Sequence, residues 1–570
     1  MQGTVKLLYK RGDRLDPANY RPITISRALS KVFSKLITER LTDLVESNVL
    51  LSDFQYGFRE GRSTQDCIFI LNTCIAKARM TKQDIHAGFL DLTSAYDRVD
   101  RKVLFEACGD IGLGPKSINL IRSLYTEDSV SYEVQNVVSD PLYLTKGVRQ
   151  GCQSSPILWN VYLKKVIDKP NASKLGVELG DKTITALAFA DDIAVIGQDA
   201  KSCKKAIAIC VEECEKIGML VNKEKSKVIS GSEIGTQSET SIIPLEQVES
   251  FGYLGAKIRI EPRKLYQTNY GQSCRTKASV YRGSSISLAA HSPDPIMFAT
   301  RIWSCCAIPA ILYASEVMLI KEADLNKIAI EQHRVMRYCL QVPGKSTNTA
   351  AQHALGMKQI KAIYYERVLS YFCKVRSAPY DSLVHRAFRT NKEIGSHYWK
   401  HVKRISKKVN WDGDQATIKT CIKNFCIKHA NEARLEHIKT MFPFPEATAQ
   451  NIFMPLPNLD FSEDSKTTNR FLLLNTGLGN RAPIKDGRSF KNCPLCGEKL
   501  NEVHLLMTCV PLEPMRIVTG IRRFIDDRNG LTSEELYKEF WNVWSISKAT
   551  KGRRAQAAKQ MLDTYMVAIN

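Results

Sequence analysis

The chain has 570 residues, of which 44% are hydrophobic and 25% are charged, a composition that excludes a disordered or fibrous protein and leaves room for several domains. Lys and Arg number 81 against 59 Asp and Glu, which gives a formal charge of +22 and favours a polyanionic partner, either nucleic acid or an acidic membrane surface. No apolar run reaches the roughly 18 residues of a membrane-spanning helix. Residues 302–314 come nearest, but Pro309 interrupts them.

The cysteines and the start of the chain bear on its cellular compartment. The 17 cysteines are odd in number and scattered through apolar segments. No signal peptide is visible, because charged residues interrupt the first apolar stretch. Both observations predict an intracellular protein with reduced thiols. Because no apolar run is long enough to span a bilayer, we expect no membrane partner.

The N-terminal region predicts a strand hairpin followed by an amphipathic helix. Residues 4–10 and 20–25 are expected strands joined by a polar loop, with Lys10 and Arg21 at its two sides. Residues 27–45 are an expected helix with Ser26 as its N-cap. Its predicted apolar face consists of Leu29, Val32, Phe33, Leu36, Ile37, Leu41 and Leu44.

Residues 55–64 combine glycines and basic side chains in a turn before another helix, whose cap is predicted near Ser63. Arg59 and Arg62 therefore lie beside a helix N-terminus, where phosphate groups bind readily. We expect these two side chains to contact the phosphate backbone of a nucleic acid.

Residues 86–91 are an expected strand, and residues 94–108 carry a helical pattern. Asp91 would lie at the carboxyl end of that strand, where open α/β sheets place their ligands. Asp97 and Asp100 fall at the start of the following helix, where carboxylates suit the helix dipole, so we interpret them as structural.

Residues 146–156 are rich in small side chains. Gly147, Gly151 and Ser155 allow close approach of the backbone to a ligand, and Gln150 can both donate and accept hydrogen bonds near a base pair or template strand. Pro156 opens the helix that follows.

Residues 186–197 place Asp191 and Asp192 at the centre of an apolar run, which predicts two buried strands joined by a turn. The pair could be an ordinary surface turn, where Asp side chains bind backbone N–H groups. It could instead bind divalent cations, which requires another carboxylate on an adjacent strand. Asp91 is the candidate for that third carboxylate.

The rest of the chain is predicted to be mainly helical. Residues 201–219 form an expected cationic amphipathic helix, residues 249–258 a strand hairpin, and residues 262–400 several helices. The basic run at 400–408 could be an RNA-binding face or a solvated helix face.

Cysteine and histidine near the end of the chain suggest a second metal site. Cys493, Cys496, His504 and Cys509 follow the pattern C-x2-C-x7-H-x4-C. These four ligands suit a closed structural Zn²⁺ site. A chance C-x-x-C is the alternative, although it leaves the following His and Cys unexplained.

Six blocks of the sequence together resemble reverse transcriptases. Residues 89–91 with 95–97, residues 146–156 and residues 189–192 resemble motifs A, B and C of that family. Residues 19–26, 55–64 and 251–255 are similar to further blocks of its non-LTR retrotransposon (LINE-type) branch, in the same order. The resemblance covers residues 1 to about 260. Two departures are Glu60, where members often have Pro, and Cys152-Gln153, where they usually have Asp-Pro.

The resemblance implies an α+β right-hand polymerase fold. Residues 1–260 would form the fingers and a ferredoxin-like palm, and residues 261–400 a helical thumb. Residues 401–490 would be a basic helical linker, and residues 491–570 a CCHC zinc knuckle with a helical tail.

The resemblance also assigns roles to the site residues. Asp91, Asp191 and Asp192, with the Leu92 carbonyl, would hold two Mg²⁺ ions that activate the primer 3′-hydroxyl and neutralise the triphosphate. The nucleotide-binding positions would be Lys10, Arg21, Tyr96, Gln150 and Gly151, and the template-binding positions Arg59, Arg62 and Ser155. Lys10 and Arg21 would hold the triphosphate, although solvated strand-end charges would look the same in sequence. Tyr96 would exclude a ribose 2′-hydroxyl, whereas without the resemblance it would be an ordinary core aromatic.

The expected function is RNA-directed DNA polymerisation on an RNA template, from a DNA primer or target and dNTPs, in the nucleus and cytoplasm. No segment predicts an endonuclease, so we expect either a fragment or a shortened copy of a retrotransposon protein. The alternatives are a catalytically inactive nucleic-acid-binding remnant and an RNA-templated RNA polymerase.

Overall fold

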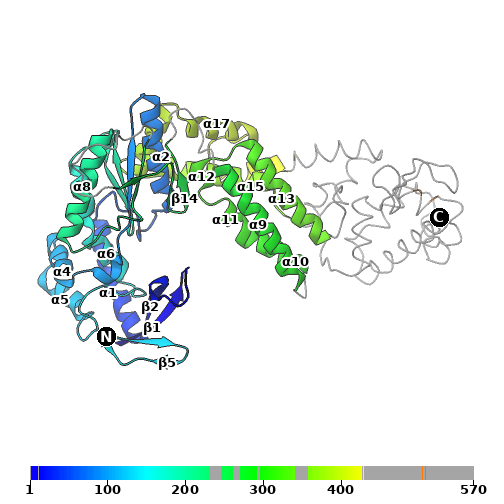
Figure 1. Cartoon of the computed structure of the whole chain (residues 1–570). Helices are drawn as coiled ribbons and strands as arrows, with labels where there is room; N and C mark the ends of the chain where they lie inside the picture. Colours follow the sequence, from blue (N-terminus) through cyan, green and yellow to red (C-terminus); the bar gives the residue numbers. More distant parts are fainter. Residues whose placement is uncertain are drawn as a thin grey trace. The chain divides into compact units, whose positions relative to one another are not determined.

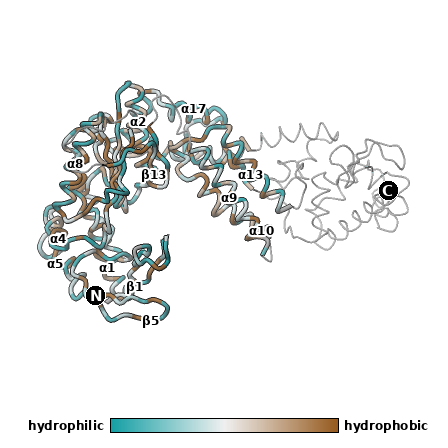
Figure 2. Tube along the Cα trace, viewed as in Figure 1, coloured by the Kyte–Doolittle hydropathy of each residue, from teal (hydrophilic) through white to brown (hydrophobic). Residues whose placement is uncertain are grey.

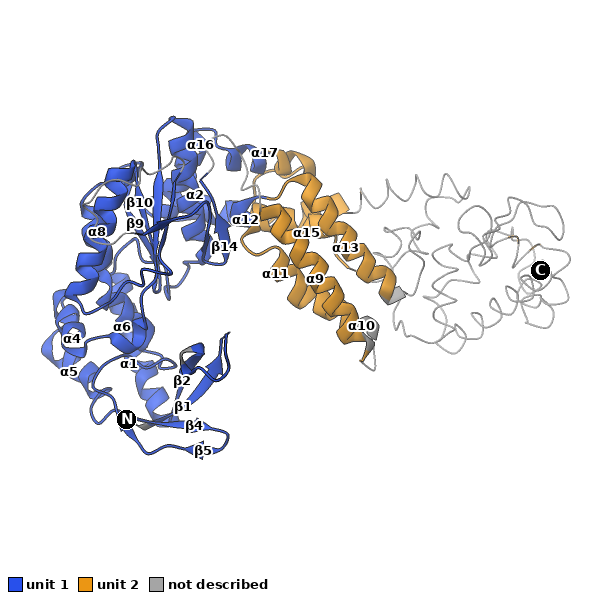
Figure 3. Cartoon of the chain, in the orientation of Figure 1, with its two compact units in different colours: residues 1–268, 316–319, 371–403 blue, residues 269–315, 320–370, 404–570 orange. Residues whose placement is uncertain are grey.

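The computed structural model of the chain describes residues 2–10, 12–230, 245–260, 270–291, 295–340 and 357–426, together with Lys428, His504 and Thr508. The chain divides into two compact units (Figure 3). The first unit comprises residues 1–268, 316–319 and 371–403, and the second comprises residues 269–315, 320–370 and 404–570. Residues 371–403 therefore belong with the first unit, although the sequence places most of them in the predicted thumb.

The first sheet of the first unit contains the predicted N-terminal hairpin. β1 (Gln2–Tyr9) pairs antiparallel with β2 (Tyr20–Ser26), and the loop between them includes the short 3-10 helix η1 (Pro17–Asn19). β1 also pairs in parallel with β4 (Ser129–Val134), which carries β5 (Val137–Val138) and β6 (Leu142–Tyr143). In Figure 1 this sheet is the lower part of the first unit, close to the label that marks the N-terminus.

The second sheet has the strand order β12-β11-β3-β10-β9. Its strands are β3 (His86–Leu90), β9 (Ala186–Phe189), β10 (Asp192–Gly197), β11 (Lys227–Ser230) and β12 (Glu246–Gln247). The four strands β11, β3, β10 and β9 are mutually antiparallel neighbours in the order fourth, first, third, second along the chain. This is the ferredoxin-like topology predicted for the palm, and the α+β class is confirmed.

Helices cover this sheet and fill its core. α7 (Lys164–Ala172) and α8 (Ala200–Lys216) pack against each other and against the sheet. The chain between β3 and β9 supplies α3 (Ala95–Arg98), α4 (Arg101–Asp110), α5 (Pro115–Ser123), α6 (Ser155–Tyr162) and the small hairpin of β7 (Val177–Leu179) with β8 (Lys182–Ile184). Trp159, Leu158, Val195 and Cys210 are fully buried in the resulting core.

The opposite face of the sheet is covered by the predicted hairpin of β13 (Phe251–Tyr253) and β14 (Ala256–Ile258). Phe89 of β3 stacks on Phe251 with ring centroids 4.6 Å apart. In Figure 2 the part of the chain near β13 is largely coloured as hydrophobic. α2 (Thr64–Met80) packs beside this sheet and against α16 (Leu383–Glu393).

The prediction for α1 (Ala28–Ser47) was partly wrong. Ser26 belongs to β2, and Arg27 occupies the N-cap position without a capping side-chain hydrogen bond. Ile37 and Leu41 are buried as expected, but Leu29 is 85% exposed and Leu36 52% exposed. The helix therefore buries only one edge of its wide apolar face.

Within the residues that the structure describes, the second unit is a bundle of helices, as predicted from its periodicity. α9 (Tyr270–Ala290) packs against α13 (Glu322–Leu340) and α10 (Pro295–Ile302). The π-helix η2 (Trp303–Ala307) and α11 (Ile308–Ile311) follow, and Pro309 explains the irregular turn because its ring clashes with the preceding helical carbonyl. α12 (Ser315–Met318), α15 (Ile360–Ser377) and α17 (His397–Val409) each continue across the boundary between the units.

None of the helices that the structure describes combines the length and apolar composition needed to span a bilayer.

Candidate active site

Asp191 and Asp192 lie where the sequence predicts, at the turn between two buried strands. β9 and β10 pair antiparallel with Phe189 opposite Asp192, which leaves Ala190 and Asp191 as the two turn residues (Figure 3). The strands on both sides are buried, whereas both carboxylates are exposed. The hairpin thus presents the two acids at one end of the sheet.

Asp91 reaches the same end of the sheet from the adjacent strand. β3 pairs antiparallel with β10, and Leu90 lies opposite Ile193. Continuing this register by one pair brings Asp91 opposite Asp192, where cross-strand side chains lie about 5 Å apart at Cβ. The structure thus brings the three predicted carboxylates together from segments about a hundred residues apart in sequence.

The three carboxylates also act on one another electrostatically. The Asp192 pKa is raised to about 6, first by partial loss of water around its carboxyl group and then by the negative charges of Asp191 and Asp91. The Asp91 pKa is also raised, chiefly by burial, with Lys225 opposing the shift, Asp191 adding to it and Lys10 opposing it. The site therefore concentrates negative charge that a cation would neutralise.

The donor chemistry of this cluster suits Mg²⁺, which prefers hard carboxylate oxygens together with water and phosphate. Within the described residues, however, no group of three or more His, Cys, Asp and Glu side chains is arranged so that it could hold a metal ion as it stands. Joint binding by all three carboxylates would require their side chains to draw closer. Leu92, the fourth predicted ligand, is buried and bridges to Val221.

The segment after α8 supports Asp91, and the sequence analysis missed this. Ser226 Oγ accepts a hydrogen bond from the Asp91 N–H at 3.0 Å, and the Asn222 N–H donates to the Asp91 carbonyl at 2.8 Å. Lys225 Nζ lies 3.9 Å from Asp91 Oδ2. In sequence, residues 222–226 look like an ordinary polar loop. Their contacts with Asp91 become visible only because the following strand, β11, pairs with β3.

Tyr96 lies beside the carboxylates rather than in the core proper. Its ring stacks on Trp159 with centroids 5.4 Å apart and meets Phe58 edge-on at 6.4 Å. The Tyr96 pKa is raised by burial and then by the charge of Asp191. The half-buried ring is thus near the turn that carries the acids.

The glycine-rich loop at 146–151 joins the carboxylate site to the first sheet. The Val148 N–H donates to the Tyr96 carbonyl at 2.9 Å, and the Thr24 N–H of β2 donates to the Gln150 carbonyl at 2.7 Å. Gly151 has a φ of +110°, and a Cβ there would lie 2.6 Å from the Thr24 carbonyl oxygen. Glycine is therefore required for this contact.

A buried ion cluster fixes the base of the same loop. Arg149 and Arg101 both pair with Asp128, which is 2% exposed, and the Arg101 contact measures 2.6 Å. Sequence reasoning did not identify this cluster, because nothing local links three charges from three separate elements.

Lys10 and Arg21 lie at the loop end of the N-terminal hairpin and are exposed. Burial raises the pKa of both Asp91 and Asp97, and the positive charge of Lys10 opposes the shift in each case. Arg21 pairs with Leu8 in the hairpin register.

Asp100, interpreted as structural, caps α4 by accepting the Lys102 N–H at 2.8 Å.

The structure argues against the expected template contacts of Arg59 and Arg62. The side chain of Arg59 is 3% exposed, and its guanidinium donates to both Glu46 oxygens at 2.7 and 2.6 Å. Arg62 donates to the carbonyls of Asp53 and Gln55 and lies over the Tyr56 ring. Both side chains hold the 52–62 loop together, Arg59 as a buried group and Arg62 as a half-buried one. The predicted cap at Ser63 is confirmed as a capping box with Asp66.

Ser155, the third predicted template contact, is 1% exposed at the start of α6.

Of the predicted zinc ligands, Cys493, Cys496 and Cys509 lie outside the described residues. His504 is buried, and its Nδ1 is 3.2 Å from Thr508 Oγ1. The zinc element stays a prediction.

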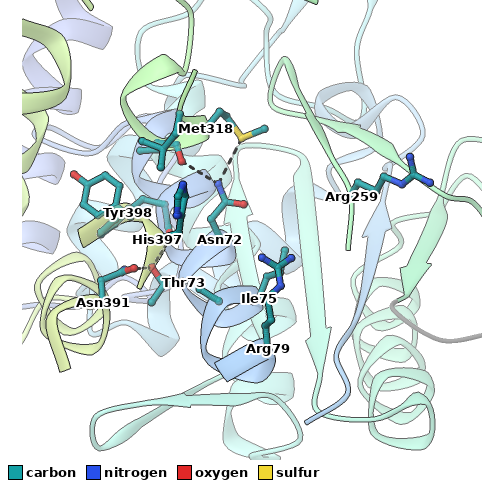
Figure 4. A pocket seen from close by; sticks show the side chains of 13 residues that line it. Asn72, Thr73, Ile75, Arg79, Arg259, Met318, Asn391, His397 and Tyr398 are labelled. Carbon is teal, nitrogen blue, oxygen red and sulfur yellow. Dashed lines mark hydrogen bonds between the residues drawn. The ribbon is translucent and has the colours of Figure 1, made fainter. Parts of the chain in front are cut away.

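A pocket of about 80 Å³ lies elsewhere in the first unit, between α2, α12, α16 and α17 (Figure 4). Asn72 Nδ2 points at the Val317 carbonyl and Met318 sulfur, and Asn391 Nδ2 donates to Thr73 Oγ1 at 2.6 Å. None of the three carboxylates lines this pocket. The side-chain amides of Asn72 and Asn391 already form hydrogen bonds with neighbouring protein groups, so we assign the pocket no ligand.

Comparison with known proteins agrees with the geometry. Residues 9–258 match the family model described as reverse transcriptase (RNA-dependent DNA polymerase). The matched segment contains the second sheet, the strands of the first sheet other than β1, and all three carboxylates, and it is a reverse transcriptase domain.

Its distant relatives are reverse transcriptases of non-LTR retrotransposons. The chain is 25% identical over 358 residues to the probable RNA-directed DNA polymerase from transposon BS of Drosophila melanogaster, covering 60% of this chain and 39% of that protein. It is 26% identical over 262 residues to the type-1 retrotransposable element R2 polyprotein of Popillia japonica, covering 44% and 36%. It is 24% identical to the RNA-directed DNA polymerase from mobile element jockey of Drosophila funebris, covering 59% and 37%.

The chain thus spans less than two fifths of the length of these relatives. Among solved structures, apo telomerase from Candida tropicalis matches 79% of this chain and 67% of its own at 13% identity, with a TM-score of 0.36. That likeness is too weak to support an argument.

Proposed function

We propose that this chain is an intracellular RNA-directed DNA polymerase of the non-LTR retrotransposon type, which extends a primer 3′-hydroxyl on an RNA template. The observation that supports the proposal is the meeting of Asp91 with Asp191 and Asp192 at one sheet end, inside a segment that matches the reverse transcriptase family. The excess of basic residues supports a nucleic-acid substrate.

The chain's own residues would divide the work as follows. Asp91, Asp191 and Asp192, with the Leu92 carbonyl, would hold Mg²⁺. When bound, Mg²⁺ lowers the pKa of the primer hydroxyl and neutralises charge on the phosphates. The positive charges of Lys225 and Lys10 both act on Asp91, which suits a triphosphate. Tyr96, near Asp191, would exclude a ribose 2′-hydroxyl by steric contact.

Primer extension by purified variants tests this proposal. Asp91→Asn and Asp191→Asn remove one charged ligand each with little change of shape, so extension should fall more than about a hundredfold, beyond the usual effect of a residue that only supports a ligand. Asp43→Asn, an exposed site on α1, is the matched control and should leave extension unchanged. Each protein is assayed with an RNA template, an annealed DNA primer, Mg²⁺ and dNTPs.

The same assay separates the alternatives. Binding of primer–template by the wild-type protein without Mg²⁺-dependent extension would support the inactive remnant. Preference for NTPs over dNTPs would support an RNA polymerase. Extension by both Asp variants at the wild-type rate would contradict the assignment of the carboxylates.

A further inference from the structure

The turn that carries Asp191 has a backbone conformation that its sequence does not favour. Ala190 has a φ of +57°, in the left-handed region. A two-residue hairpin turn with positive φ at its first position normally has glycine there, because a Cβ is crowded in that conformation. Something in the surrounding structure must hold Ala190 in place.

A buried loop runs along β9 up to this turn. The Tyr56 N–H donates to the Ala188 carbonyl at 2.8 Å, and the Ala188 N–H donates to the Phe54 carbonyl at 2.9 Å. Gln55, between them, is 2% exposed. Its Nε2 donates to the Ala190 carbonyl at 3.5 Å, and its Oε1 accepts the Gly57 N–H at 3.2 Å. One amide side chain thus connects the loop to the left-handed residue.

Gly57 closes the contact from the other side. A Cβ at position 57 would lie 2.2 Å from the Ala190 nitrogen, so only glycine fits against the turn. Asn160 of α6, which is 1% exposed, donates from Nδ2 to the Gly57 carbonyl at 2.9 Å and fixes its position. Gln55 and Gly57 therefore contact Ala190, and Asn160 holds Gly57 in place.

We propose that Gln55, Gly57 and Asn160 form a clamp that holds Ala190 in its left-handed conformation and so sets the positions of Asp191 and Asp192 for metal binding. The three are positioning residues, since none carries a charge or replaces a carboxylate. The inference rests on the proposed function, because it assigns the clamp to the same metal site. It predicts that a clamp variant loses divalent-metal affinity, whereas a control variant that is destabilised to the same extent keeps it.

Asn171 offers a matched control. It is also a buried amide, 8% exposed, and it also binds β9, with Nδ2 donating to the Ala186 carbonyl at 3.0 Å. Ala186 is at the end of β9 away from Asp191. Asn171→Leu should therefore lower thermal stability as Asn160→Leu does but leave the metal site unchanged.

The experiment compares Asn160→Leu, Gln55→Met and Asn171→Leu in the full chain. Mn²⁺ is titrated without nucleic acid, and free Mn²⁺ is followed by electron paramagnetic resonance. The Mg²⁺ concentration for half-maximal primer extension and the melting temperature are measured alongside. We expect both clamp variants to weaken Mn²⁺ binding and to raise the Mg²⁺ midpoint by about tenfold, as for residues that orient metal ligands. Asn171→Leu should change neither.

The result that would overturn the proposal is an equal shift in all three variants, or none in the clamp variants. If Asn160→Leu does not fold, Gln55→Met decides the question. Ala190→Gly in the Gln55→Met background adds a rescue: glycine tolerates the left-handed conformation, so Mn²⁺ affinity should return to within about threefold of wild type. A wild-type protein that binds Mn²⁺ but does not extend primers would contradict the proposed function. The clamp would then be tested by the Mn²⁺ titration alone. A wild-type protein that does neither would overturn both.

Discussion

At the scale of single residues, Asp192 gives the site a testable pH dependence. Its pKa is about 6 in the folded chain, above the ordinary carboxyl value near 4, so the folded state binds the proton more tightly than the unfolded state. Ionisation of Asp192 therefore destabilises the metal-free protein above pH 6, and this cost disappears below about pH 4. Asp192→Asn should raise the melting temperature at pH 7.5, with the gain shrinking as the pH falls through 6.

Thermal melts of both proteins without divalent ions, between pH 4.5 and 8, check this expectation. A gain that stays constant over the whole range would show that Asp192 carries no raised pKa. The Mg²⁺ affinity of the wild-type protein should fall as the pH is lowered from 8 to 4.5, because protonation of Asp192 removes a ligand charge.

Tyr96 makes a prediction about sugar selection. Its ring is held by the stack on Trp159, so its position next to the turn is fixed. Tyr96→Val removes the ring and should reduce the preference for dNTPs over NTPs by about tenfold or more, because the steric block is lost. Single-nucleotide incorporation kinetics measure the ratio. Tyr143→Val, at an exposed position on β6, is the control, and an unchanged ratio in Tyr96→Val would remove the residue from this role.

The sequence predicted the acidic residues at strand ends because each lies next to a strand with a strong local signal, and the structure places them there. Their role in metal binding stays a prediction. The resemblance to known motifs then linked Asp91 to the distant pair. Arg59 and Arg62 were misinterpreted because their partners, Glu46 and the carbonyls of the 52–55 loop, are set by tertiary packing. Lys225 was missed for the same reason: its distance to Asp91 depends on the pairing of β11 with β3.

At the scale of elements, the N-terminus of α2 rests on a buried carboxylate. Asp66 is 1% exposed, and it accepts hydrogen bonds from the Ser63 N–H at 2.8 Å, the Tyr371 hydroxyl at 3.0 Å and Lys374 Nζ at 2.7 Å. It thereby ties α2 to the end of α15 within the first unit. The interaction links segments more than 300 residues apart, so no sequence pattern predicts it.

Asp66→Ala should lower the free energy of unfolding by about 3 kcal/mol, because it removes a helix cap and leaves the Tyr371 hydroxyl buried without its acceptor. Urea unfolding followed by circular dichroism measures the change. Asp43→Ala on the exposed side of α1 is the control and should change it by less than about 0.5 kcal/mol. A loss below about 1 kcal/mol for Asp66→Ala would show that the network contributes little.

Element prediction succeeded where the hydrophobic pattern was local and failed where burial was decided elsewhere. The β9–β10 hairpin, the β13–β14 hairpin and α8 follow from alternation and helical spacing. For α1 the same spacing predicted one buried face, yet Leu29 and Leu36 are exposed. A helical pattern identifies apolar positions, but which of them become buried depends on the neighbours that pack there.

At the scale of the whole molecule, the net charge of +22 predicts salt-sensitive binding of nucleic acid. Affinity for an RNA–DNA primer–template should fall at least about tenfold between 50 and 200 mM salt, because bound phosphates release counterions. Fluorescence anisotropy with a labelled duplex measures this. Asp91→Asn should bind at least as well as wild type at every salt concentration, since it removes a negative charge near the phosphates. Affinity independent of salt would contradict the polyanion assignment.

The most direct test of the central claim is a structure of the chain with primer, RNA template, incoming dNTP and Mg²⁺. The account predicts that carboxylate oxygens of Asp91 and Asp191 both bind Mg²⁺ at about 2.0–2.1 Å, beside the primer 3′ end and the triphosphate. A complex in which the nucleotide binds elsewhere, or in which Asp91 touches no ion, would contradict it.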